Sequence, residues 1–329
     1  MEKIIKFGIL GTGWIADKMA DALSSVNGAQ KYAVASRGGD KASAFAQKYG
    51  FEKSYGSYEA LVADPDVDVV YIATPHNLHF ENTMMCIDQG KNVLCEKPFA
   101  VNAHQVHQMI DHARNKGVFL MEAMWSRFLP HMIHAKQMVD SGQLGKIHLL
   151  VADFCIHRPM TDPLDRKFNP ELIGGALMDI GIYPVFLAQY ILGAPLDQVS
   201  MAGLGVTGVD LNCSSIYQYP GQTQAVLHSS FLAESGVKAA IYGEKGSLVF
   251  DSFWFMPGDL TFIDIDGKST PIHFEKVSNG YNYEAEEVVR CIRAGLKQSP
   301  MMTWDDSIAL IDRLDAIRHQ CGIVYPGHD

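Results

Sequence analysis

Basic runs, metal-binding cysteine spacings and membrane-length apolar runs are all missing from this sequence of 329 residues. The formal net charge is −10 at pH 7, and the lysines and arginines form no cluster, which argues against a nucleic-acid partner. The six cysteines lack C-x-x-C spacing, so we expect reduced packing residues and no zinc site. The longest apolar run, residues 182–194, is too short to cross a bilayer, and a strand-like run begins too early to leave room for a signal peptide. We therefore expect a cytoplasmic protein with small-molecule ligands, no metal and no membrane partner.

Lysine and arginine are also absent between residues 168 and 237, and Asp210 is the only charged residue between Gln198 and Ala233. An antiparallel sheet with one solvated face carries charges at alternate positions. Their absence predicts that both faces are covered, one by helices of the same domain and the other by a second subunit in a C2 homodimer. The alternative is a solvated face that carries uncharged polar residues.

Residues 6–16 have the order strand, glycine turn, helix. An apolar run is followed by a G-x-G-x-x-A turn, and helical spacing resumes at residues 17–23. The first glycine permits the turn, the second lets the backbone approach a pyrophosphate, and the helix N-terminus faces the negative charge. The pattern predicts a dinucleotide site at Gly11, Thr12, Gly13, Trp14 and Ile15.

The second strand, residues 31–36, bears on which dinucleotide is bound. Its end is the place where the fingerprint expects an acid for the ribose 2′-hydroxyl, but this chain has Ser36 and Arg37. A hydroxyl and a guanidinium suit a 2′-phosphate, so we predict NADP rather than NAD as the cofactor. The alternative is that Arg37 lies on a solvated turn.

Two patterns of elements divide the chain. Up to residue 121, short apolar strands alternate with helices, which predicts an α/β Rossmann domain with a doubly wound parallel sheet. Beyond it, strand-like runs are grouped between helices, which predicts an α+β domain with a large, mostly antiparallel open sheet. The length also favours two domains. We assign residues 1–121 to dinucleotide binding and 122–329 to substrate binding and dimerisation.

The loop after the third long strand is expected near the nicotinamide, because ligands of open α/β sheets bind at the carboxyl ends of strands. Its candidate contacts are Thr74, Pro75, His76 and His79. A three-residue histidine spacing with no third ligand in register does not indicate a metal pair, so we predict a nucleotide-loop role.

Two further stretches carry groups for chemistry. Glu96-Lys97-Pro98 places a lysine between a buried strand and a proline, which restricts the preceding residue. The structural alternative is an ion pair of Lys97 with Glu96. Asp179 and Tyr183 are four residues apart and share one face of a helix.

Together these stretches resemble the Gfo/Idh/MocA family of glucose-fructose oxidoreductases and inositol dehydrogenases, over nearly the whole chain. Residues 122–128, 174–183, and 303–307 with 322–326 are similar to its dimeric dihydrodiol dehydrogenase branch, also described as NADP-dependent D-xylose dehydrogenases. The resemblance implies a Rossmann domain, a sheet domain that dimerises through its open face, and Lys97 with Tyr183 as the catalytic pair.

The chain departs from the family pattern at two points. Many members have histidine where this chain has Tyr183, although the dihydrodiol branch uses tyrosine. That branch has three glycines where this chain has Ile173, Gly174 and Gly175.

Tyrosine suits a proton transfer if its pKa is lowered. A free phenol has a pKa about three units above neutrality, so ionising it costs about 4 kcal/mol, and a nearby ammonium removes much of that cost. We therefore expect Tyr183 to act as acid and base, Lys97 to activate it and bind a substrate hydroxyl, and Asp179 to orient the substrate or Lys97.

Apolar side chains beside polar ones suit the ring of a cyclic polyol. Trp125 and Phe154 are candidate walls, with Arg127, His157 and Arg158 near the mouth. The alternative is that the aromatic residues belong to the core. We expect cofactor contacts near the nicotinamide from Glu96, Lys97, Trp125 and Arg127, and substrate contacts from Lys97, Trp125, Phe154, His157, Asp179 and Tyr183.

These expectations describe an NADP-linked alcohol dehydrogenase or carbonyl reductase that acts on a sugar or cyclic diol. Two alternatives remain. A nucleotide-sensing regulator of this family lacks the catalytic lysine and acid, whereas Lys97 and Tyr183 are both present. A glycosidase that oxidises its substrate transiently would hold NAD tightly, whereas Ser36 and Arg37 favour NADP.

Overall fold

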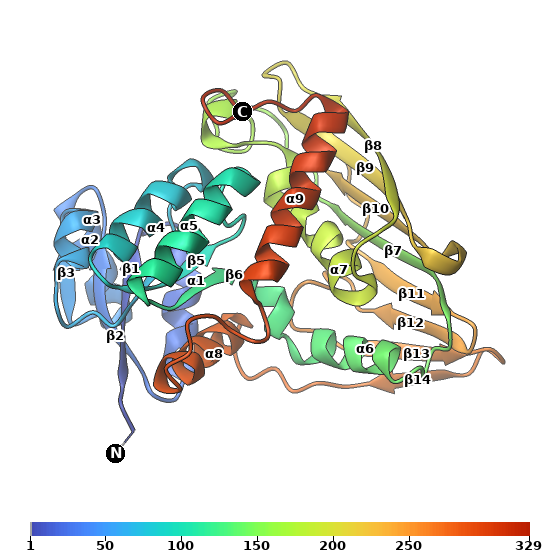
Figure 1. The fold of residues 1–329 in the computed structure, drawn as a ribbon, viewed down its shortest axis with the longest axis horizontal. Coiled ribbons are helices and arrows are strands. Elements are labelled where there is room, and N and C mark those ends of the chain that lie inside the picture. The colour runs from blue at the N-terminus through green and yellow to red at the C-terminus, as the bar shows by residue number, and fades with distance from the viewer. Residues whose placement is uncertain (1) are drawn as a thin grey trace. The chain divides into compact units, whose positions relative to one another are not determined.

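The apolar runs of the N-terminal half form a six-stranded parallel sheet in the computed structural model, which describes residues 2–329 (Figure 1). The strand order is β3-β2-β1-β4-β5-β6, that of a doubly wound dinucleotide-binding sheet, so the predicted Rossmann fold is confirmed. β3 is too short and polar for its sequence to reveal it. The strands are β1 Ile5–Leu10, β2 Ala29–Ala35, β3 Lys53–Tyr55, β4 Val69–Ile72, β5 Asn92–Glu96 and β6 Leu120–Ala123.

Helices connect these strands, and their ends follow local chemistry. The Asn102 side chain accepts a hydrogen bond from the Gln105 amide at 2.9 Å where α5 begins, and Gly117 ends that helix in the left-handed conformation. Ser57 caps α3 in the same way. The helices are α1 Trp14–Ala22, α2 Gly39–Tyr49, α3 Tyr58–Val62, α4 His79–Asp88 and α5 Ala103–Lys116.

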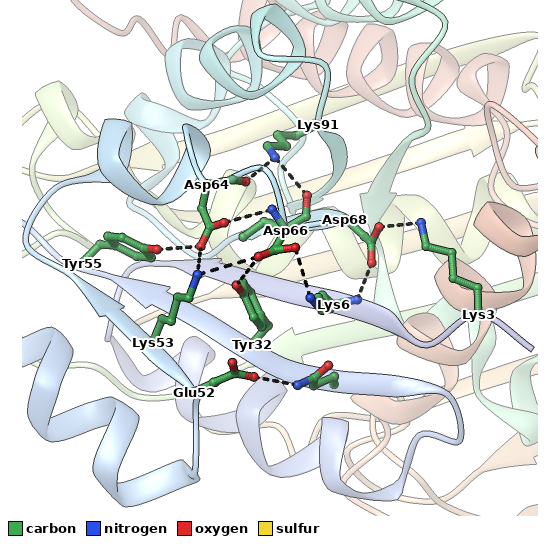
Figure 2. Close-up of polar contacts among 12 residues, drawn as sticks. Lys3, Lys6, Tyr32, Glu52, Lys53, Tyr55, Asp64, Asp66, Asp68 and Lys91 are labelled. Carbon is green, nitrogen blue, oxygen red and sulfur yellow. Dashed lines mark hydrogen bonds and ion pairs between the residues drawn. The ribbon is translucent and has the colours of Figure 1, made fainter.

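A polar network fixes the loop that leads into β4 at the amino end of the sheet (Figure 2). The carboxylate of Asp64 accepts hydrogen bonds from the Tyr55 hydroxyl at 2.6 Å and the Lys53 ammonium at 2.9 Å. Burial would raise the pKa of Asp64, but these bonds lower it to about 2. The buried ammonium of Lys91 donates to the carbonyl oxygens of Asp64 and Val67. The network therefore anchors the amino end of the sheet.

An eight-stranded sheet forms the second half of the chain, in the order β14-β13-β12-β11-β7-β10-β9-β8. β7 pairs with β10 in parallel, and every other pairing is antiparallel. The predicted large, mostly antiparallel sheet is therefore confirmed. The strands are β7 Ile147–Cys155, β8 Asp197–Leu204, β9 Asp210–Gln218, β10 Gln224–Ser230, β11 Ala239–Gly243, β12 Gly246–Phe250, β13 Leu260–Asp264 and β14 Ser269–Ile272.

Helices cover one face of this sheet, and the opposite face carries none in Figure 1 among residues 2–329. Helix α7, Ile182–Leu192, packs on β7 and β10, and α9, Trp304–Cys321, bonds to β8 through Arg313 and Gln198 at 2.7 Å. On the uncovered face, Val199 pairs with Ile216, and Ile216 pairs with Val226. This row is apolar and uncharged. One face of the sheet is covered by helices, as expected. The covering of the opposite face by a second subunit stays a prediction.

The chain divides into two units whose boundaries differ from the expected 1–121 and 122–329. One unit runs to Phe128 and includes Val277–Ile308, and the other consists of Leu129–Lys276 and Ala309–Asp329. Helix α8, Tyr281–Arg293, therefore belongs with the Rossmann strands, whereas α6, Pro130–Asp140, belongs with the large sheet. The reason is visible at β6, where the Leu120 amide donates to the Lys297 carbonyl and the Trp304 indole donates to the Leu120 carbonyl, both at 3.0 Å.

The segment Pro170–Leu192 is long and apolar enough to cross a membrane, but 83% of its most apolar window is buried inside the protein. This segment includes most of the apolar run at residues 182–194. A π-helical turn, Leu177–Gly181, precedes that run and leads directly into α7. Burial against β7 and β10 accounts for its composition, as in the core helix of a folded domain.

Candidate functional site

The glycine turn between β1 and α1 has the shape that a dinucleotide requires. Gly11 has a φ of +105°, and a Cβ there would lie 2.6 Å from the Ala73 carbonyl oxygen, so no other residue fits. A Cβ at Gly13 would meet nothing within 4 Å, which leaves open space at the first turn of α1. The backbone amides of this turn can therefore be reached by a pyrophosphate.

Three predicted neighbours of the turn flank this open space. Thr12 and Ile15 are half-buried, and the Trp14 indole is exposed, with the Lys18 ammonium 5.4 Å from its ring centroid. The exposure of a large apolar ring to water is unfavourable, and a bound nucleotide would cover this ring. Contact of these side chains with the cofactor stays a prediction.

The corner after β2 places Ser36 in the interior and Arg37 on the surface. The Ser36 amide donates to the Tyr55 carbonyl at 3.2 Å, which fixes the corner beside β3. Burial raises the pKa of Tyr58, and the positive charge of Arg37 opposes that rise, which places the guanidinium near the first turn of α3. Tyr58 is thus a neighbour of Arg37 that its sequence position does not reveal, and the binding of a 2′-phosphate by Arg37 stays a prediction.

His79 links the loop after β4 to the Glu96-Lys97-Pro98 stretch. Its two ring nitrogens lie 2.7 Å from the Pro98 carbonyl oxygen and 3.0 Å from that of Thr74. The Thr74 hydroxyl also accepts from the Asn82 amide group at 3.0 Å. Because His79 is fully buried between these two carbonyls, it links the loops that follow β4 and β5. Direct cofactor contacts of Thr74, Pro75, His76 and His79 stay predictions.

Glu96 ends β5 as a buried acid beside Lys97. The Tyr71 hydroxyl donates to one carboxylate oxygen, and the Lys97 amide donates to the other at 3.2 Å. Burial raises the pKa of Glu96 to about 7, although the positive charge of Lys97 lowers it. The peptide bond from Lys97 to Pro98 is cis. The carboxylate thus both anchors the turn and lies close enough to the lysine to interact with its charge.

Two more buried acids surround this stretch. Glu122 on β6 accepts from the Phe99 amide at 3.1 Å, and burial raises its pKa to about 7. Glu284 on α8 is fully buried, and neither of its carboxylate oxygens has a hydrogen-bond partner among residues 2–329. Burial and the neighbouring charge of Glu96 raise the pKa of Glu284 well above its usual value. Three acids in one interior cannot all be charged at neutral pH.

The burial of Glu284 could have been predicted from the sequence. Tyr281, Ala285 and Val288 recur at helical spacing and form the buried face of α8, and Glu284 lies on that same face. An acid at a core position of a helix is rare unless it has a specific role. Glu122, by contrast, lies in a short strand whose sequence does not show whether this position is buried or exposed.

Trp125 lies in the interior of the first unit. Its ring stacks on Tyr281 with centroids 4.3 Å apart and an interplanar angle of 9°. Arg127 is half-buried, and its amide donates to the Met124 carbonyl at 2.8 Å. The roles predicted for both in ligand binding stay predictions, and the stacking supplies a structural role for Trp125 as well.

In the second unit, Asp179 and Tyr183 lie on one continuous helical segment, the π-helical turn followed by α7. Asp179 accepts a hydrogen bond from the Arg166 guanidinium at 3.1 Å. The Tyr183 ring has centroid distances of 5.6 Å to Phe154 and 4.9 Å to Phe255. The structure therefore places the Tyr183 ring against Phe154 and Phe255, and the Arg166 guanidinium against Asp179. The roles predicted for Phe154, Asp179 and Tyr183 stay predictions.

His157 and Ile173 have less regular positions. His157 is exposed beyond the end of β7, and its amide donates to the Glu234 carboxylate at 3.2 Å. Ile173 has a φ of +59°, in the left-handed region that favours glycine. The glycine of the dihydrodiol branch would fit there without strain, whereas a β-branched residue pays about 1–2 kcal/mol.

The predicted residues fall into two sets. Those of the glycine turn, the loops after β2, β4 and β5, and Trp125 with Arg127 belong to the first unit, whereas Phe154, His157, Asp179 and Tyr183 belong to the second. The meeting of Lys97 with Tyr183 stays a prediction. Within residues 2–329, no three histidine, cysteine, aspartate or glutamate side chains are grouped to hold a metal ion.

Known proteins resemble the chain over almost its whole length. One family model, described as "Oxidoreductase family, NAD-binding Rossmann fold", matches residues 5–124, and a second, described as "GFO/IDH/MocA C-terminal domain", matches residues 132–249. The trans-1,2-dihydrobenzene-1,2-diol dehydrogenase of Xenopus laevis is 39% identical and covers 98% of this chain and 99% of its own. The D-xylose 1-dehydrogenase (NADP(+)) of Hypocrea jecorina is 33% identical over 98% of this chain and 93% of its own.

A solved structure is similar as well. The aldose-aldose oxidoreductase from Caulobacter crescentus, complexed with glycerol, superposes with a TM-score of 0.88 at 25% identity and covers 97% of this chain and 98% of its own. The resemblance noted from the motifs is confirmed by these matches.

The buried acids predict how stability depends on pH. Their pKa values are raised in the folded state, so the folded chain binds more protons than the unfolded chain, and stability falls as pH rises from about 5 through 7 and above. Glu284→Gln replaces one of these acids by a neutral group. We expect its unfolding free energy, measured with denaturant from about pH 6 to pH 9, to fall less steeply, by up to about 1.4 kcal/mol per pH unit.

Glu286→Gln is the matched control, because Glu286 lies exposed on the same helix. Parallel profiles for Glu284→Gln and the natural chain would show that Glu284 carries no perturbed proton.

Proposed function

Because the chain belongs to the GFO/IDH/MocA oxidoreductase family of NAD(P)-dependent sugar and diol dehydrogenases, we propose that it transfers a hydride between NADP and a secondary alcohol or carbonyl group of a sugar or cyclic diol. The observation that carries the cofactor assignment is the open turn at Gly11 and Gly13, at the carboxyl end of β1. The names of the relatives support D-xylose and aromatic dihydrodiols as the first substrates to test.

The residues present fit such a cofactor. The amides of the glycine turn would hold the pyrophosphate, Ser36 and Arg37 the 2′-phosphate, and the loop at Thr74 with the Glu96-Lys97 turn the nicotinamide end. When bound, the nicotinamide supplies the acceptor or donor for the hydride.

The chain supplies the proton chemistry. We assign the transfer of the hydroxyl proton to the Tyr183 phenol, whose aromatic neighbours Phe154 and Phe255 exclude water from one side of its ring. Lys97 would lower the cost of ionising that phenol and bind a substrate hydroxyl. Asp179, held by Arg166, would orient the substrate. In the reducing direction the phenol returns the proton.

Replacing the proton-transfer residue tests this assignment. We expect Tyr183→Phe to lower kcat by about 10²- to 10⁴-fold, because the hydroxyl is lost while the ring still packs. Tyr190→Phe on the same helix, where Tyr190 stacks on Phe186, is the matched control and should retain turnover. Steady-state rates with NADP and a panel of sugars and diols give the comparison. Similar kcat values for Tyr183→Phe and the natural chain would exclude Tyr183 from catalysis.

The choice of cofactor has its own test. A guanidinium bonded to a phosphate contributes about 1.5–3 kcal/mol, so we expect Arg37→Ala to lower the ratio of kcat/KM for NADP to that for NAD by about 10- to 100-fold. Lys41→Ala removes an exposed positive charge on the neighbouring α2 and should leave the ratio nearly unchanged. An unchanged ratio for Arg37→Ala would place the 2′-phosphate elsewhere.

Two results would favour the alternative functions. Binding of NADP without turnover of any substrate would favour the regulator. Transient oxidation with tightly held NAD would favour the glycosidase.

We further propose that the uncovered face of the eight-stranded sheet binds a second copy of the chain. The side chains of Val199 and Met201 are 64% and 76% exposed on this face, and the row from Val199 through Ile216 to Val226 carries no charge. A twofold axis would place the same apolar row against itself, which needs no complementary charges.

Light scattering after size-exclusion chromatography tests the dimer. We expect the natural chain to have twice its monomer mass, and Val199→Lys with Ile216→Lys to be a monomer, because paired lysines cannot be buried against their own symmetry copies. Leu164→Lys changes an exposed apolar residue outside the sheet and should remain a dimer. A natural chain that is monomeric at micromolar concentration, or a dimeric double variant, would contradict the proposal.

A further inference from the structure

The isolated charge at Asp210 has a structural setting that the reaction chemistry leaves unused. Asp210 opens β9, and none of its surface reaches solvent. Its Oδ2 accepts a hydrogen bond from the Leu177 amide at 2.7 Å. Leu177 begins the π-helical turn that carries Asp179, and the same helical segment reaches Tyr183.

The preceding turn is shaped around this carboxylate. Gly175 has a φ of +116°, and a Cβ there would lie 2.2 Å from Oδ1 of Asp210. The acid therefore occupies the space that a side chain at position 175 would need. This explains why glycine stands at that position more directly than its backbone conformation alone.

A second bond holds the same turn from the end of the chain. The Tyr325 hydroxyl, fully buried, donates to the Gly174 carbonyl at 2.9 Å. A Cβ at Gly174 would lie 2.8 Å from the Arg166 carbonyl oxygen, so the segment bearing Arg166 packs directly on the turn. Arg166 in turn binds Asp179 at 3.1 Å. The turn thus connects Asp210, Tyr325 and Arg166 to the start of the helix.

We propose that Asp210 is a positioning residue, which fixes the Gly174–Leu177 turn through the Leu177 amide and so sets the place of Asp179 and Tyr183. It does so without touching the substrate, because it is fully buried. The inference rests on the proposed function only in assigning proton transfer to Tyr183. The contacts of Asp210 with the turn stand without it.

Three variants separate this role from a general loss of stability. Asp210→Ala removes the acceptor, Asp210→Asn keeps an acceptor oxygen of the same shape, and Gly175→Ala pushes on the carboxylate from the other side. Steady-state rates give kcat and KM for each variant, and the fluorescence of NADPH gives the Kd for the cofactor. Because the cofactor residues belong to the other unit, the NADPH Kd should change by less than about twofold in all three.

The expected result is a split between binding and turnover. A displacement of the reacting group by about 1 Å costs about 10²-fold, so we expect Asp210→Ala to lower kcat by about 10- to 100-fold and Asp210→Asn by less than about fivefold. Gly175→Ala should also lower kcat, and the double variant with Asp210→Ala should lose less than the product of the two single effects, since the clash is gone. If Asp210→Ala does not fold, Tyr325→Phe loosens the same turn more gently.

Hydrogen exchange of the amides in 174–183 provides a readout that needs no activity. Faster exchange in Asp210→Ala than in Asp210→Asn supports the proposal even if the natural chain turns over no substrate, which would count against the proposed function alone. The proposal is overturned if Asp210→Ala keeps kcat and exchange rates within about twofold of the natural chain, or if Asp210→Asn falls as far as Asp210→Ala.

Discussion

The hydrogen bonds that keep the Glu96 carboxylate in the interior fix the turn on which the chemistry proposed for Lys97 depends. Tyr71 and the Lys97 amide hold the two carboxylate oxygens at the end of β5, and the acid in turn interacts with the charge of Lys97. A buried charge survives only when such donors replace water. The same bonds that stabilise the acid therefore fix the turn from which the lysine projects.

The second unit uses a buried carboxylate for a related purpose. Asp210 accepts from the Leu177 amide at the start of the helical segment that carries Asp179 and Tyr183. In both units a strand supplies the acid, and an amide of the adjacent turn supplies the donor. In the proposed mechanism, the placement of Lys97 and Tyr183 rests on these interior bonds, because a surface ion pair would be too weak and too mobile to provide it.

Sequence patterns revealed what local physics determines. Apolar runs predicted the central strands, and the turn at Gly11 followed from the need for a positive φ and a close backbone approach. The strands β3 and β14 are short and lie at the edges of their sheets, and most of their residues are not apolar, so they lack the apolar run that marks the central strands. Residues 277–308 return to the first unit through the packing of α8 on α1 and through bonds to Leu120, which no local periodicity encodes.

Isotope transfer shows whether a hydride moves between a carbon of the substrate and the nicotinamide. A sugar or cyclic diol deuterated at the reacting carbon is incubated with the enzyme and NADP, and the mass of the reduced cofactor is measured by mass spectrometry. Hydride transfer would place one deuterium in each molecule of NADPH formed. Deuterium released to solvent, or product formed with no reduced cofactor, would contradict it.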